Sequence, residues 1–130
     1  MNKVYTSLEQ SKKLAEILPP ESVDAIYYYH PKLECSGGWY EFSYGTNKIN
    51  HPYDIPCWSL TALYGILPNN EKESTTLSRG GWEIEPPKYI DNWWCEYEDD
   101  NHIKDFTVSA DNPVDACYKM ILKLNELNLL

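Results

Sequence analysis

The chain has 130 residues, and its 20 acidic side chains against 11 Lys and Arg give a net charge of −9. This length suits one hydrophobic core, so we predict a single compact domain over residues 1–130. An acidic chain without a Lys/Arg stripe argues against direct binding of nucleic acid. Because no apolar run could span a bilayer and no signal peptide is visible at the start, we expect a cytoplasmic protein without a membrane partner.

The first third of the chain predicts a helix followed by a β-hairpin. Ser7 or Thr6 can cap the start of the helix, and Pro19-Pro20 ends it. Residues 25–30 are rich in tyrosine, and residues 39–44 alternate between two faces, so both segments are expected to be strands.

The middle of the chain predicts a second helix and then a long loop. Pro56 suits a first helical turn, and an apolar seam follows it as far as Leu67. Residues 69–81 are polar and contain two adjacent glycines, which is typical of a loop, and residues 82–85 are expected to form a short strand.

The last third predicts two paired strands and a third helix. The strands are expected over residues 92–98 and 103–109, with a turn between them, and Asn112 and Pro113 have the types that cap and open a helix. The fold is therefore expected to be α+β, with an antiparallel sheet of four to five strands and about three helices packed mainly on one face.

The four cysteines, Cys35, Cys57, Cys95 and Cys117, are widely spaced, and three of them lie in apolar runs. This pattern indicates buried free thiols rather than a disulfide framework. Metal ligands need short Cys or His spacings that the chain lacks, and no nucleotide-binding loop or nucleophile motif is complete. We therefore expect no metal, no cofactor and no catalytic residue.

Three stretches resemble a known group of proteins. They are residues 5–19 (YTSLEQSKKLAEILP), 55–60 (IPCWSL) and 110–117 (ADNPVDAC), the last running into 120–124 (MILKL). Together they are similar to small proteins of phages and mobile elements in gut bacteria, a group without an established activity. The resemblance implies an origin in such an element, and it supplies no site residue.

The aromatic and acidic residues favour a binding function. Trp94, Glu96 and Glu98 alternate with an apolar set, so they are expected to project together from one outward face, and Asp99 and Asp100 extend their charge. We predict that these five residues bind a protein partner with a basic surface, as an accessory protein that binds or inhibits a host protein would.

A second hypothesis is a binder that sequesters a nucleotide-like small molecule in an aromatic pocket. The residues expected to stack on that ligand are Tyr27, Tyr29, Trp39 and Trp93. An aromatic pocket with an Arg or Lys inside would favour this hypothesis, whereas a flat acidic face would favour the protein partner. The sequence leaves a homo-oligomer and an enzymatic activity open.

Overall fold

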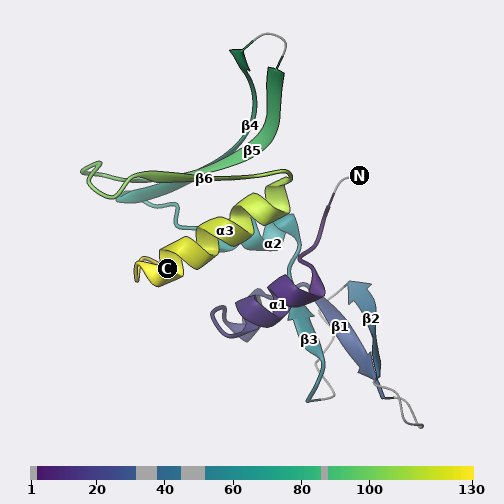
Figure 1. Ribbon diagram of the computed structural model, residues 1–130. Coiled ribbons are helices and arrows are strands. Elements are labelled where there is room, and N and C mark those ends of the chain that lie inside the picture. The colour runs from purple at the N-terminus through teal and green to yellow at the C-terminus, as the bar shows by residue number, and fades with distance from the viewer. Residues whose placement is uncertain (1–2, 32–37, 45–51, 86–87) are drawn as a thin grey trace. The chain divides into compact units, whose positions relative to one another are not determined.

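A computed structural model describes residues 3–31, 38–44, 52–85 and 88–130 (Figure 1). The chain divides into two compact units, an N-terminal unit of residues 5–62 and a C-terminal unit of residues 63–130 together with residues 1–4. A single domain over residues 1–130 stays a prediction. The α+β class is confirmed, because the two units contain helices and two antiparallel sheets.

The N-terminal unit is a three-stranded antiparallel sheet with one α-helix. Its elements are α1 (Leu8–Ala15), a 3-10 turn (Pro20–Ser22), β1 (Ala25–His30), β2 (Trp39–Tyr44) and β3 (Ile55–Cys57), and the strand order is β2-β1-β3. Helix α1 packs against β3. The expected hairpin is confirmed, since β1 and β2 pair from Ala25 opposite Tyr44 to His30 opposite Trp39.

Helix α1 begins at a full capping box. The Ser7 hydroxyl accepts from the Gln10 backbone N–H at 3.2 Å, and the Gln10 side chain accepts from the Ser7 N–H at 3.0 Å. Leu14, on the inner side of the helix, is fully buried. The predicted helix start is therefore confirmed.

The core of the N-terminal unit is centred on Trp58. Its side chain is fully buried, and its Nε1 donates to the Ser22 hydroxyl at 2.9 Å. Ile26 and Cys57 are buried as well. Burial of an indole with its N–H satisfied is a large favourable contribution, because the ring leaves water and no donor is lost.

The C-terminal unit contains the second sheet and the longest helix. Its elements are β4 (Glu73–Glu85), β5 (Lys88–Asp99), β6 (Phe106–Ala110) and α3 (Pro113–Glu126), and α2 (Leu60–Ile66) crosses the boundary between the units. The strand order is β4-β5-β6, and α3 packs against the sheet (Figure 1). The paired β4 and β5 extend past the end of β6, which pairs only with residues 93–97 of β5.

Helix α3 begins as the sequence predicts. The Asn112 side chain accepts from the Asp115 N–H at 2.9 Å, and Pro113 occupies the first turn. Lys3 pairs with the Asp115 carboxylate at 2.8 Å. The inner side of α3, which includes Cys117 and Leu124, is fully buried.

Three predictions on the fold are wrong. The expected sheet of four to five strands is in fact two sheets of three strands, and the helices do not all pack on one face of one sheet. Residues 69–81 were expected as a loop, but β4 begins at Glu73, because alternate residues of this polar segment face the core. The helix expected from Pro56 begins at Leu60 instead.

Pro56 belongs to β3, where it lies opposite Ile26 on an edge strand. An edge strand tolerates a proline because its outward N–H has no partner to lose. The cap of α2 is Ser59, whose hydroxyl accepts from the Ala62 N–H at 3.1 Å. Ser59 is itself fixed by Asp24, whose carboxylate accepts from the Ser59 N–H at 2.8 Å.

The expected free thiols are confirmed for Cys57, Cys95 and Cys117, all of which are buried. Cys35 lies outside the described residues. Within the described ranges, no helix has both the length and the apolar character that a membrane span needs.

Candidate functional site

The side chains of β5 alternate between the core and the outside of the second sheet. Cys95 and Tyr97 are buried. A hydrogen bond with Cys117 of α3 raises the pKa of the Cys95 thiol, and burial raises it further. The side chains between and beside them, Glu96 and Glu98, therefore project from the face that α3 does not cover. Glu96 is exposed, and Glu98 is half-buried.

Small hydroxyl residues of the neighbouring strands surround these side chains. Trp94 of β5 lies between Ser78 of β4 and Ser109 of β6. Glu96 lies between Thr76 of β4 and Thr107 of β6. We call this surface the outer face, defined by Ser74, Thr76, Ser78, Trp94, Glu96, Glu98, Thr107 and Ser109. Its one aromatic ring belongs to Trp94, and its charged side chains are both acidic.

The indole N–H of Trp94 lacks a hydrogen-bond acceptor among the described residues. The residue is half-buried, yet its indole Nε1 is shielded from solvent and has no hydrogen-bond partner within the part of the chain that the structure describes. A buried donor without a partner costs about 1–3 kcal/mol. This position is therefore not optimised for stability alone.

The two glutamates of the outer face repel each other. A hydrogen bond with Glu98 and burial raise the pKa of Glu96, and the negative charges of Glu98 and Asp105 raise it further. The fold keeps these carboxylates together although their mutual repulsion opposes it. A cation placed beside them would relieve that repulsion.

The turn after β5 adds carboxylates beside the outer face. Asp99 is occupied in shaping the turn, because its side chain accepts from the Ile103 N–H at 3.0 Å and the Lys104 N–H at 3.3 Å. Asp105 lies 2.8 Å from His102 Nδ1, and this hydrogen bond raises the pKa of His102. Asp100, the next residue along the turn, is exposed.

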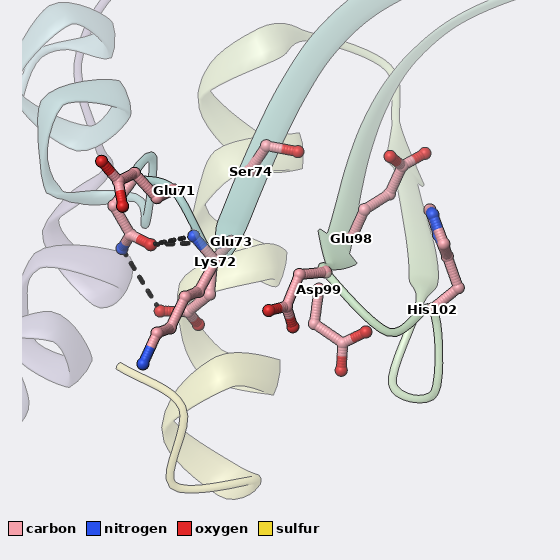
Figure 2. Close-up of a pocket in the computed structure, with 9 residues that line it drawn as sticks. Glu71, Lys72, Glu73, Ser74, Glu98, Asp99 and His102 are labelled. Carbon is pink, nitrogen blue, oxygen red and sulfur yellow. Dashed lines mark hydrogen bonds between the residues drawn. The ribbon is translucent and has the colours of Figure 1, made fainter.

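A cleft of about 210 Å³ lies where β4 begins and β5 ends (Figure 2). Figure 2 shows that its walls come from the segment that leads into β4 and from the end of β5 with its turn. Its residues include two cross-strand pairs, Glu73 with Asp99 and Ser74 with Glu98. Five carboxylates line it against Lys72 and His102, and they belong to Glu71, Glu73, Glu98, Asp99 and Asp100.

Glu73 is fixed in place within this cleft. One carboxylate oxygen accepts from the Tyr97 hydroxyl at 2.6 Å, and the other lies 3.4 Å from the Asn70 amide nitrogen. Burial and the Glu73 carboxylate raise the pKa of Tyr97, so Tyr97 stays a donor. In the described part of the chain, no three His, Cys, Asp or Glu side chains are arranged to hold a metal ion.

Each of the five predicted partner-binding residues lies either on the outer face or in the cleft beside it. Trp94, Glu96 and Glu98 share the outer face, whereas Asp99 and Asp100 continue into the cleft through Glu98, which belongs to both. Glu71 and Glu73 are cleft residues that were not predicted, because residues 69–81 were expected to form a loop. The alternation of Thr75 and Leu77 with polar residues is the signal that could have revealed β4.

The four residues predicted to stack on a small ligand are distributed over different surfaces. Tyr27 and Tyr29 share one face of β1, and each is paired there with another ring, Phe42 or Tyr40. Trp39 is on the opposite face of the same sheet, stacked on His30 with ring centroids 4.1 Å apart. Trp93 belongs to the C-terminal unit, where Arg79 lies over its ring at 5.9 Å.

Comparison with known proteins finds no matching family model, no matching curated protein and no matching solved structure.

Proposed function

We propose that this chain is a non-catalytic binding protein that recognises a protein partner with a basic surface. The binding surface consists of the outer face of the second sheet and the acidic cleft beside it. The link to phages and mobile elements, and hence to a host protein as the partner, rests on the sequence resemblance.

The observation that carries the proposal is one aromatic ring set among acidic and small hydroxyl side chains on an uncovered sheet face. Trp94 has the residue type most enriched at binding hot spots. Ser78 and Ser109 on either side leave room for a partner group to approach the ring. Its shielded Nε1, which has no hydrogen-bond partner among the described residues, supports a role for this ring beyond stability.

The carboxylates define the chemistry of the partner. Glu96 and Glu98 are close enough for Glu98 to raise the pKa of Glu96, so a Lys or Arg side chain beside them would relieve repulsion as well as gain attraction. The cleft offers further carboxylates to a second basic side chain. Acids on a surface mainly speed association by steering, whereas a desolvated aromatic anchor slows dissociation.

A capture experiment tests the proposal. Immobilised wild type, Trp94→Ala and the double variant Glu96→Lys, Glu98→Lys are exposed to cell lysate at low and high salt, and bound proteins are identified by mass spectrometry. We expect wild type to capture a basic protein at low salt, with less captured at high salt because exposed charges are screened. Both variants are expected to lose most of it.

A matched control separates the site from the total charge. The double variant Glu16→Lys, Glu21→Lys changes the net charge equally, at exposed positions of the N-terminal unit. It should capture the partner as wild type does. Equal capture by wild type and both outer-face variants at every salt concentration would place the interface elsewhere and contradict the proposal.

A further inference from the structure

Strand β2 is an edge strand that lacks the usual protection against pairing. Among the described residues β2 pairs with β1 alone, and its six residues follow an unbroken register without a bulge. Natural edge strands are commonly protected by charged side chains, above all lysine, by proline or by bulges. The strand WYEFSY contains no lysine, proline or bulge, and its one charged side chain is Glu41.

The exposed aromatic residues of the N-terminal unit are concentrated on this strand. Trp39, Phe42 and Tyr44 are 52%, 39% and 74% exposed. Helix α1 packs against β3, the other edge of the sheet. Lys12 of α1 reaches β2 over the face of the Tyr40 ring, at 5.9 Å, and no described strand pairs with the outer edge of β2.

The sequence of β2 is complementary to itself in one antiparallel register. Two identical antiparallel edge strands are related by a two-fold axis perpendicular to the sheet, and paired residues must lie on the same face. The axis therefore passes through a residue and not between two residues. The two residues at the centre of β2 are Glu41 and Phe42, so the pairing can be centred on either of them. Centring on Glu41 would place two glutamates opposite each other, which is destabilising.

Centring on Phe42 avoids that repulsion and pairs rings with rings. Phe42 then lies opposite Phe42 of the second strand, and Tyr40 lies opposite Tyr44 on the same face. Glu41 lies opposite Ser43 on the other face. Aromatic cross-strand pairs are among the more stabilising ones in antiparallel sheets.

We propose that β2 pairs with β2 of a second copy of this chain, antiparallel and centred on Phe42. The two three-stranded sheets then form one six-stranded sheet in the order β3-β1-β2-β2-β1-β3. This interface is separate from the outer face of the C-terminal unit, and it does not depend on the proposed function.

The experiment is sedimentation velocity of the full chain over a dilution series. Wild type should show a concentration-dependent dimer. Phe42→Lys places two lysines opposite each other, and Tyr44→Lys removes the most exposed ring of the strand, so both should abolish the dimer. The control Tyr53→Lys changes a ring that is 62% exposed outside β2, and it should leave the dimer intact.

One variant tests the register itself. In the proposed pairing, residue 43 of each copy lies opposite Glu41 of the other copy. Ser43→Lys therefore creates two lysine–glutamate pairs, and it should tighten the dimer severalfold at low salt. Circular dichroism on each variant verifies that it is folded. A wild type that stays monomeric throughout, a dimer that survives both Phe42→Lys and Tyr44→Lys, or a dimer that Ser43→Lys weakens would each overturn the proposal.

Discussion

The two units use the same sheet architecture to present different surfaces. Each described sheet contains three antiparallel strands, in the order β2-β1-β3 or β4-β5-β6. The long helix α3 packs against the C-terminal sheet. Its uncovered face is acidic and polar, with one tryptophan. In the N-terminal sheet, aromatic side chains occupy both faces of the β1–β2 pair, and the open feature is an edge. The comparison shows that a small sheet can offer either a face or an edge for recognition.

Charge and aromatic content divide in the same way. Residues 5–62 carry seven acidic and four basic side chains, a net charge of −3, and ten of the 18 aromatic residues. The other residues carry 13 acidic and seven basic side chains, a net charge of −6, and eight aromatic residues. Most of the negative charge therefore lies outside the N-terminal unit, and more than half of the aromatic residues lie within it.

The largest expected effect comes from the core of the N-terminal unit. Trp58→Ala should lower the free energy of unfolding by about 3–5 kcal/mol, because it leaves a cavity where a fully buried indole was. Hydrogen exchange measures this change separately for the amides of β1 and β5. Equal loss of protection in both strands would support the predicted single domain, whereas loss in β1 alone would show two independent units.

The corresponding change in the C-terminal unit is Leu124→Ala. This side chain of α3 is fully buried, so its truncation should cost about 2–5 kcal/mol. Leu127, which is 42% exposed at the end of the same helix, provides the control, and Leu127→Ala should cost much less. An unchanged thermal midpoint for Leu124→Ala would mean that α3 does not pack on the sheet through this side.

The helix caps allow a matched comparison of the two units. Asn112→Ala removes the cap of α3 and Ser7→Ala that of α1, so each should cost about 1 kcal/mol in chemical denaturation. Asn112→Asp keeps an acceptor at the cap and should lose less than Asn112→Ala. Equal losses for the Asp and Ala variants would remove capping as the explanation.

The smallest expected effect concerns the repulsion on the outer face. The folded state raises the pKa of Glu96, so it binds the proton of this carboxyl more tightly than the unfolded state does. The stability that protonated Glu96 contributes is therefore present in acid, and it is lost as the pH rises through the raised pKa. Glu96→Gln imitates the protonated form, so it should stabilise the protein at neutral pH, by no more than about 0.5 kcal/mol at this exposed position.

The pH dependence and a control distinguish this effect from a general one. The gain from Glu96→Gln should vanish in acid, where the wild-type carboxyl is itself protonated. Glu126 lies 4.0 Å from Lys123, so Glu126→Gln should bring no gain at any pH. A gain from Glu96→Gln that persists unchanged in acid would contradict the assigned cause.

Capping residues and alternating side chains in the sequence correctly predicted several helices and strands. The Asn112-Pro113 cap and the Ser7 capping box fixed the starts of α3 and α1, and strict alternation predicted β2. The helix start predicted at Pro56 is wrong, because the first turn of a helix and the outward side of an edge strand both tolerate a residue without a backbone N–H. The division into two sheets depends on long-range pairing, which no local pattern contains.

The candidate site was predicted in part for the same reason. The alternation around Cys95 and Tyr97 was enough to place Trp94, Glu96 and Glu98 on one face. The cleft was not predictable, because Glu73 reaches it through cross-strand pairing with Asp99. Asp99 was expected to bind a partner, and its contacts with backbone N–H groups show that it also shapes its own turn.

The most direct test of the acidic outer face as a binding surface is the kinetics of binding to the captured partner, measured over a range of salt concentrations. We expect Glu96→Lys, Glu98→Lys to slow association and to reduce its dependence on salt, because these acids steer a basic surface. Trp94→Ala should instead accelerate dissociation, because it removes the anchor. Association and dissociation rates equal to those of wild type in both variants, at low and high salt, would contradict the account.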